Sequence, residues 1–284
     1  MADAWRRLRR NRPAMAGLVY IVILVLVAIF APVLAPADPY KQELLSRLAP
    51  MGAPSQITRT GTFILGADHL GRDILSRVIY GSRISLAVGL ISQFIVTVIG
   101  VTVGLLAGYY GGWFDSLVMR ICDILFAFPD LLFCIGIMFA LGPGLLNIYI
   151  ALSVVGWAGM ARLVRGQVMA LKETEYVEAA RAQAVGDLRI MFRHILPGCL
   201  APVIVSITLG IPGAIMSEAS LSFLGLGAQP PTASWGSMIY DARAYLRTHP
   251  LFSVWPGIAI MLTVFAFNLF GDGLRDALDP RMKT

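Results

Sequence analysis

An uncharged apolar run near the start of the chain limits what the chain can fold into. The stretch AMAGLVYIVILVLVAIFAPVLAP, residues 14–36, carries no charged side chain. At a rise of about 1.5 Å per residue, a helix of this length crosses a hydrocarbon core of about 30 Å. The apolar part of a cleaved signal peptide is shorter, about 7–15 residues. The run is therefore predicted to be a retained membrane span.

Similar apolar stretches recur along the chain, and the composition agrees with them. Hydrophobic residues make up 57% of the 284 residues, and charged residues only 14%, against about 25% in soluble domains. Buried helices of soluble proteins rarely stay uncharged beyond about 14 residues. The prediction is an all-α integral membrane protein with six spans, near 14–36, 84–108, 117–141, 145–164, 199–217 and 251–270.

The segments outside the core have their own patterns. Residues 1–13 hold five arginines and are predicted to form a basic tail. Within the polar segment 37–83, the stretch 68–86 spaces its apolar residues as one helix face, with Arg72, Asp73 and Arg77 on the others. This pattern predicts an amphipathic helix at the membrane surface that leads into the second span. Residues 84–272 would form a core of five spans, followed by a tail at 273–284.

Three glycines in the second span have a spacing typical of helix packing. Gly100, Gly104 and Gly108 follow each other at intervals of four residues, and so lie on one helix face. Glycines at this spacing let the backbone of another helix approach closely. We expect a packing role for them.

The distribution of lysine and arginine predicts the orientation. With the N-terminus inside, the inside segments hold 15 basic residues and the outside segments 8, of the 23 in the chain. Because cytoplasmic loops collect basic residues, this bias places both termini and the loop 165–197 in the cytoplasm. The six basic residues of the outer segment 37–83 weigh mildly against this orientation.

The loop 165–197 is predicted to contain two short helices. Thr174 suits the N-cap of the first helix and Gly186 its C′ position, after which Asp187 would cap the second. In the second helix, residues 188–196, the apolar side would consist of Leu188, Met191, Phe192 and Ile195. Pro197 would end it before the fifth span.

Small side chains on the first helix are suited to docking. Alanines stand at positions 179, 180, 182 and 184, and small residues let a helix fit closely into a groove on a partner. Glu178 would pair with a basic residue of that partner. An ordinary connecting loop with a solvated face accounts for these residues equally well.

This loop resembles a known motif. The residues EAA at 178–180, Gly186 and ILP at 195–197 are similar to the EAA loop of ATP-binding-cassette importer permeases. Three further stretches, at 65–86, 217–239 and 271–281, narrow the resemblance to the C-type permease subunit of dipeptide, oligopeptide and nickel importers. The resemblance covers nearly the whole chain.

The resemblance implies a type I importer permease in a bacterial inner membrane, surrounded by membrane lipid. The loop would dock in a cleft of a cytoplasmic ATPase and couple its movement to the spans. The implied partners are a homologous second permease, two ATPases and an extracytoplasmic peptide-binding protein. The cargo would be short peptides, with nickel chelates or glutathione as alternatives. The implied coupling residues are Glu178, Ala179, Ala180, Gly186, Asp187, Leu188, Ile195, Leu196 and Pro197.

The chain lacks the motif for binding ATP itself. A P-loop needs a lysine directly after a glycine, and none of Lys41, Lys172 and Lys283 has that neighbour. ATP and Mg²⁺ are therefore expected on partner subunits, with no cofactor or metal on this chain. The sequence also contains no catalytic constellation and no nucleic-acid motif.

Acidic residues near the spans are candidates for the transport pathway, because ionisable groups at membrane depth are costly. For Asp130, which follows Pro129, lining the pathway and bonding freed backbone groups are both open. Glu218 fits either the rim of the pathway or an interface, and Asp123 fits the pathway or a place near the inner surface. An ion-driven secondary transporter using Asp123 and Asp130 is the alternative function, although the inverted repeats of that class are not evident.

Overall fold

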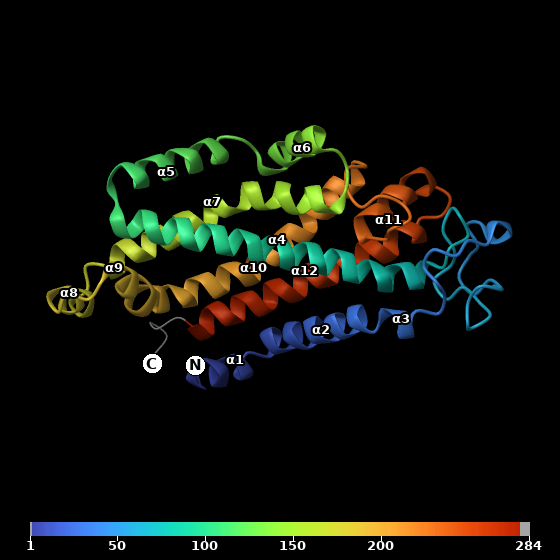
Figure 1. Ribbon diagram of the computed structural model, residues 1–284. Coiled ribbons are helices and arrows are strands. Elements are labelled where there is room, and N and C mark those ends of the chain that lie inside the picture. Colours follow the sequence, from blue (N-terminus) through green and yellow to red (C-terminus); the bar gives the residue numbers. More distant parts are fainter. Residues whose placement is uncertain (1, 279–284) are drawn as a thin grey trace.

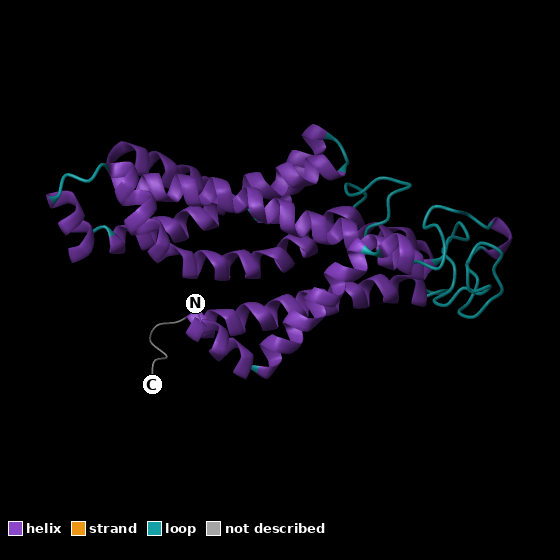
Figure 2. Cartoon of the chain, turned by 60° about the horizontal axis from the view of Figure 1, so that its bottom comes forward, coloured by secondary structure: helices purple, strands orange, loops and turns teal. Residues whose placement is uncertain are grey.

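The computed structural model describes residues 2–278 and is built from helices (Figures 1 and 2). The long helices are α2 (Arg12–Ile29), α4 (Ile74–Tyr110), α7 (Leu145–Leu171), α10 (Leu196–Phe223) and α12 (Leu251–Leu278). The shorter helices are α1 (Ala2–Arg10), α3 (Ala31–Leu34), α5 (Gly112–Phe126), α6 (Asp130–Leu141), α8 (Glu175–Ala182), α9 (Asp187–Arg189) and α11 (Trp235–Ala242). Short 3₁₀ turns lie at Leu44–Ser46 and Arg243–Tyr245, and a π-helical turn at Ile190–Ile195.

Five helical segments of the described chain are long and apolar enough to cross a membrane. A sixth crossing requires α5 and α6 to be counted together, although they meet at an angle of 93°. The region 117–141 is therefore not one straight helix, although the bent pair α5 and α6 supplies the sixth span when it is counted as a broken one. The break falls at Pro129, which lacks an N–H and disfavours helical geometry at the residue before it.

The second span is longer than expected and absorbs the proposed surface helix. Helix α4 begins at Ile74, where Asp73 caps it by accepting a hydrogen bond of 2.7 Å from the Ser76 amide. It then continues for 37 residues, or about 55 Å, well beyond a bilayer core of about 30 Å. The separate amphipathic helix at 68–86 is a wrong prediction, because 68–73 are loop and the rest is one helix with the span.

The helices form an elongated bundle with distinct ends (Figure 1). Helices α4 and α7 lie side by side, while α10 and α12 pack along the other side of the bundle, with α2 against α12. Helices α1, α8 and α9 lie at one end, together with the last turn of α12. The segment 35–73 and α11 lie at the opposite end.

Helix α2 is attached to the bundle by one narrow face. Its buried residues are Ala14, Gly17, Leu24 and Ala28. A Cβ at Gly17 would lie 2.5 Å from the carbonyl oxygen of Ala266 in α12, so only glycine allows this approach. Tyr20, Ile21 and Val25 pack in part against the bundle, whereas Val19, Val22, Ile23 and Leu26 are exposed, as expected on the lipid side of a membrane helix.

Candidate functional site

The loop between α7 and α10 begins with helix α8, and the prediction that Thr174 caps this helix is only partly right. Helix α7 continues to Leu171, and Thr174 then takes the N-cap position of α8. Its carbonyl accepts hydrogen bonds from the amides of Val177 and Glu178, at 3.0 and 3.1 Å. The Thr174 hydroxyl does not cap α8, because it donates to the Leu171 carbonyl at 2.6 Å. The side chain thus joins α7 to α8.

The end of α8 differs from the prediction for Gly186. The left-handed residue is Ala184, with φ of 55°, and the Val185 amide bonds back to the Ala180 carbonyl at 3.1 Å. This six-to-one bond is the signature of a Schellman motif with Ala184 at C′. Gly186 has an ordinary φ of −65° and forms the N-cap of α9, so Asp187 is the first residue of α9 and not its cap.

The second helix of the loop does not end at Pro197. Residues Ile190–Ile195 form a π-helical turn that runs directly into α10. Since Pro197 cannot donate to a carbonyl one turn back, a wider turn at this point keeps the helix continuous. The predicted apolar face is also only partly right. Met191 and Ile195 are buried, whereas Leu188 and Phe192 are 66% and 59% exposed.

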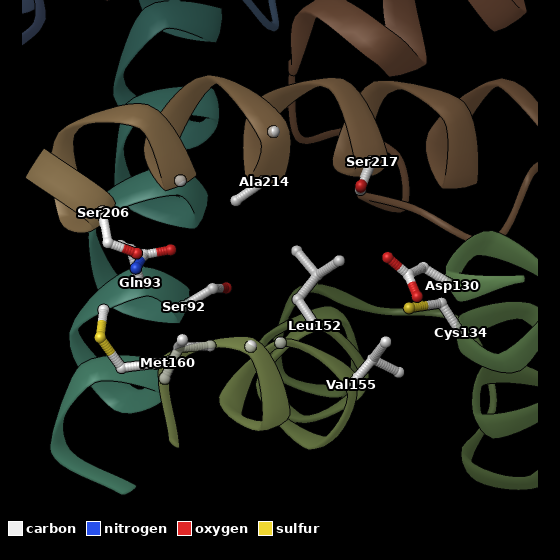
Figure 3. A pocket seen from close by; sticks show the side chains of 15 residues that line it. Ser92, Gln93, Asp130, Cys134, Leu152, Val155, Met160, Ser206, Ala214 and Ser217 are labelled. Atoms are coloured by element: carbon white, nitrogen blue, oxygen red, sulfur yellow. The ribbon is translucent and has the colours of Figure 1, made fainter. Parts of the chain in front are cut away.

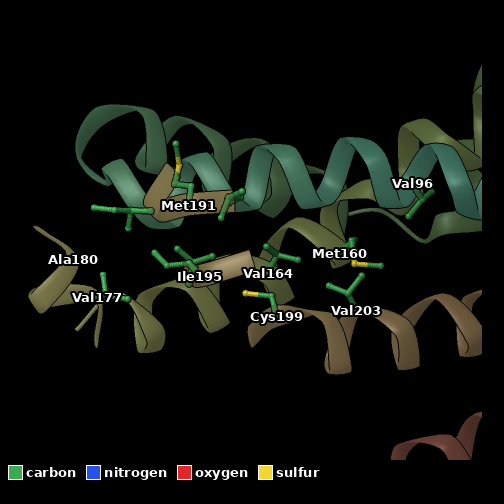
Figure 4. Packing of buried hydrophobic residues seen from close by; sticks show 12 residues of the cluster. Val96, Met160, Val164, Val177, Ala180, Met191, Ile195, Cys199 and Val203 are labelled. Atoms are coloured by element: carbon green, nitrogen blue, oxygen red, sulfur yellow. The ribbon is translucent and has the colours of Figure 1, made fainter. Parts of the chain in front are cut away.

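The loop has a packed face, whose buried side chains are drawn in Figure 4, and a free face. Val177, Ala180, Met191 and Ile195 belong to one buried cluster with residues of α4, α7 and α10. The free face carries the other candidate residues, which are exposed or partly so. These are Glu178, Ala179, Gly186, Asp187, Leu188, Leu196 and Pro197. The packed face fixes the loop to the bundle and leaves the other side open.

A hydrogen bond missed by sequence reasoning ties the loop to α4. The Tyr109 hydroxyl donates to the Asp187 carboxylate, with 2.7 Å between Oη and Oδ1. The Arg181 guanidinium of α8 lies 5.6 Å from the centre of the Tyr109 ring. Tyr109 is in the last turn of α4, and no local pattern indicated that it would meet a residue 78 positions further on.

A cavity of about 310 Å³ lies inside the bundle between α4, α6, α7 and α10 (Figure 3). Its polar lining residues are Ser92, Gln93, Asp130, Ser206 and Ser217, and its apolar ones include Leu152, Val155 and Met160. A larger cleft of about 830 Å³ between α7, α10 and α12 shares two of these lining residues, Ser206 and Gly210. The two hollows therefore adjoin, and the larger one reaches Arg275 near the end of α12.

The structure separates the acidic pathway candidates. Asp130 lines the cavity, whereas Glu218 is fully buried beside it and accepts a hydrogen bond of 2.6 Å from the Ser222 hydroxyl. Asp123 lies on the surface and pairs with Arg162 at 2.6 Å. Of the three, only Asp130 reaches the hollow interior.

The three glycines of α4 lie against α7. A Cβ at Gly100 would be 2.5 Å from the Met160 Cβ, and one at Gly108 would be 2.8 Å from the Val168 Cβ. At Gly104 it would collide with the Ala161 backbone. Helices α4 and α7 are thus in backbone contact along this face.

The opposite end of the bundle holds buried ion pairs. Arg72 Nε lies 2.6 Å from Asp68 Oδ2, and Arg72 Nη2 lies 3.3 Å from Asp241 of α11. Arg77 Nε is 3.5 Å from the same Asp68 oxygen. Arg72 and Arg77 are only 4% and 2% exposed. They are therefore not the polar face of a surface helix, because nearby Asp68 and distant Asp241 partner them inside the protein.

Two groups beside these ion pairs have shifted pKa values. Burial lowers the pKa of His69 below its ordinary 6.5, against the opposing attraction of Asp68. The His69 ring stacks near Tyr245 and Phe252, with ring centroids 6.1 and 6.0 Å away. Burial also raises the pKa of the Asp73 carboxyl, although hydrogen bonds from Ser76 oppose the shift. In the described residues, no group of three His, Cys, Asp or Glu side chains is placed to hold a metal.

Comparison with known families places the chain. The sequence profile described as binding-protein-dependent transport system inner membrane component matches residues 100–284. The chain belongs to that family. The profile for the N-terminal transmembrane domain of oligopeptide transport permease C matches residues 1–50. This inner membrane component is therefore an ATP-binding-cassette importer permease, and the predicted resemblance is confirmed.

Named relatives cover nearly the whole inner membrane component. The glutathione transport system permease protein GsiD of Pectobacterium atrosepticum is 45% identical over 282 residues, 99% of this chain and 91% of that protein. The protein of the same name from Escherichia coli is 48% identical over 281 residues, 99% of this chain and 90% of that protein. Membership of this family implies that the chain functions together with an ATPase and a substrate-binding protein.

A solved structure supports the fold. The MetNI methionine ABC transporter, described in an inward-facing conformation, matches with a TM-score of 0.58 at 20% identity. The match covers 72% of this chain and 98% of that chain. The predicted all-α permease fold of a multi-pass inner membrane protein is thus confirmed.

Proposed function

We propose that this chain is one of two permease subunits that import a small peptide of the glutathione kind. Two ATPases would drive the complex, and an extracytoplasmic binding protein would supply the cargo. The 45% and 48% identity to glutathione permeases, across nearly the full chain, favours glutathione over a general dipeptide or a nickel chelate.

The observation that carries the coupling role is the two-faced loop at 165–197. Its packed face is held by the buried cluster that contains Val177 and Ile195, and its free face presents Glu178, Ala179 and Leu188. A segment fixed on one side and open on the other transmits a push from a docked partner to the helices. We assign ATPase docking to this free face.

The charge bias favours a cytoplasmic position for this end of the bundle. Both α1 and the last turn of α12 lie at the same end, so the two termini would also be cytoplasmic. Helix α11 and the segment 35–73 would then face the binding protein. The cavity with Asp130 and the adjoining cleft near Arg275 form the half of the pathway that this chain contributes, open toward the cytoplasm.

Reconstitution tests this proposal. The complete complex in proteoliposomes, with its binding protein outside and ATP inside, should accumulate radiolabelled glutathione. Accumulation should stop when a non-hydrolysable ATP analogue replaces ATP. Transport of a general dipeptide at an equal or higher rate would contradict the glutathione assignment, and accumulation driven by an ion gradient without ATPase would contradict the whole mechanism.

A further inference from the structure

The Asp130 carboxylate is unlike the other acids of its neighbourhood. It is the first residue of α6, and its side chain points into the cavity (Figure 3). No hydrogen bond or ion pair joins this carboxylate to another described residue. By contrast, Asp115 and Asp123 of the preceding helix α5 pair with Arg165 and Arg162. A helix N-terminus tolerates an acid there, but this alone does not explain why it faces a hollow.

The rest of the cavity lining offers no positive charge to balance this carboxylate. Among the described lining residues, Asp130 is the only charged side chain. A carboxylate group of a cargo therefore meets repulsion beside Asp130, and an ammonium group meets attraction. Asp130 is exposed in this chain, so water weakens this preference without removing it.

Uncharged polar groups in the same cavity also lack partners. Ser92 is 1% exposed, and its hydroxyl has no hydrogen-bond partner, although buried hydroxyls usually have one. Gln93 and Ser206 lie beside it, across the cavity from Asp130 and Ser217 (Figure 3). Leu152 and Val155 form an apolar surface between the two polar groups.

We propose that Asp130 binds the ammonium group of an amino-bearing peptide cargo as the cargo crosses this chain. Ser92 and Gln93 form hydrogen bonds with its amide groups from the other end of the cavity. This inference rests on the proposed function, because it deepens the assignment of a peptide cargo. The contact is a charge-assisted hydrogen bond in a cavity open to the adjoining cleft, so it selects the cargo without trapping it.

Protection of an engineered cysteine tests the inference without the binding protein. Ser217→Cys would be introduced into the complete, detergent-solubilised complex after Cys122, Cys134 and Cys199 are replaced by alanine. The rate of N-ethylmaleimide labelling at position 217 would be measured with increasing S-methylglutathione. The comparison ligand is S-methylated glutaryl-cysteinylglycine, which lacks only the amino group.

S-methylglutathione should slow labelling, and the ligand without the amino group should need about a tenfold higher concentration for the same protection. Asp130→Asn should raise the half-protecting concentration of S-methylglutathione about tenfold and remove the difference between the ligands. Asp130→Glu should retain most of the difference. Asp123→Asn, on the paired acid outside the cavity, should behave as the wild type does.

Three results would overturn the inference: no protection by either ligand, equal protection by both in the wild type, or unchanged protection in Asp130→Asn. The proposed function has its own readout, ATP-driven glutathione uptake. If glutathione is taken up but the protection of position 217 does not depend on the amino group, only the role of Asp130 is contradicted. If the protection depends on the amino group but glutathione is not taken up, the role of Asp130 stands and the proposed cargo is contradicted.

Discussion

Tyr109 donates a 2.7 Å hydrogen bond to Asp187 and thereby joins the last turn of α4 to the first residue of α9. Asp187 belongs to the motif that resembles the EAA loop, and the structure gives its carboxylate a partner in a spanning helix. A displacement of α9 would thus be transmitted directly to α4 through this hydrogen bond. It would also be transmitted to α10 through the continuous helix.

Removing this hydrogen bond should loosen the loop without unfolding the bundle. Tyr109→Phe keeps the ring and loses only the hydroxyl, which is worth about 0.5–1 kcal/mol at a partly exposed site. Amide hydrogens of residues 175–189 should exchange roughly two- to fivefold faster, as followed by mass spectrometry. Tyr110→Phe is the matched control, since its exposed hydroxyl makes no hydrogen bond to a described residue. Equal exchange rates in the two variants would show that the hydrogen bond between Tyr109 and Asp187 does not stabilise the loop.

Crowding the free face should uncouple ATP hydrolysis from transport. A Cβ at Gly186 meets no atom within 4 Å, and the backbone there is ordinary, so Gly186→Trp fits this chain and obstructs only a docked partner. Glu178→Arg reverses the charge on the same face. Both variants should insert normally, yet peptide uptake per ATP hydrolysed should fall roughly tenfold or more. Gly186→Ala should transport normally, and unchanged uptake by both disruptive variants would refute the docking assignment.

The contact between α4 and α7 should not tolerate even one methyl group at its centre. Gly104→Ala places a Cβ against the Ala161 backbone, and relief requires the helices to separate. We expect a loss of about 1–3 kcal/mol, seen as a lower thermal unfolding midpoint in detergent. Gly166→Ala in α7 is the control, because its Cβ meets nothing within 4 Å. That substitution should be neutral or slightly stabilising, and equal destabilisation by both would argue against the packing role.

Mild acid should weaken the end of the bundle that holds the buried ion pairs. Burial lowers the pKa of His69 in the folded protein, so below about pH 6.5 the unfolded chain binds a proton that the folded chain resists. Stability from this group is therefore complete above pH 6.5 and is lost as the pH falls through the folded pKa. The raised pKa of Asp73 acts in the opposite direction, at more acidic pH.

A variant that cannot titrate at this position isolates the effect. His69→Phe keeps a ring beside Tyr245 and Phe252 and removes the proton site. The thermal unfolding midpoint of the wild type should decrease as the pH is lowered from about 7.5 to about 5.5. In the variant, most of this dependence of the midpoint on pH should be lost. An equally steep slope in His69→Phe would assign the acid sensitivity to other groups.

Hydropathy was sufficient to predict where the spans lie in the sequence, but not where they bend. In lipid, a backbone must satisfy its own hydrogen bonds, so uncharged runs such as 14–36 become helices whatever their neighbours are. The 93° bend before Asp130 and the π-helical turn before Pro197 were missed. Whether proline breaks or merely widens a helix depends on packing around it. Met191 and Ile195 are packed at the second site, and the first lies on an exposed edge.

The other features that could not be predicted from the sequence depend on contacts between residues that are far apart in the chain. Arg72 is buried because Asp241, 169 positions away, accompanies Asp68 as its partner. Ser92 and Gln93 carry no motif, and they became visible as cavity residues only once four helices were placed together. The first helix of the loop at 165–197 could be predicted because its residues are close in sequence. Ala184 in place of Gly186 as the left-handed residue was not predictable from residue preference alone.

Because the π-helical turn passes without a break into α10, residues 187–223 form one continuous helical segment of roughly 50 Å. Tilting a rigid rod of that length by one degree sweeps its far tip through about 1 Å. An ATPase grasping Leu188 would therefore need to rotate it by only a few degrees to shift Ser217 and the ceiling above Asp130 by the width of an atom.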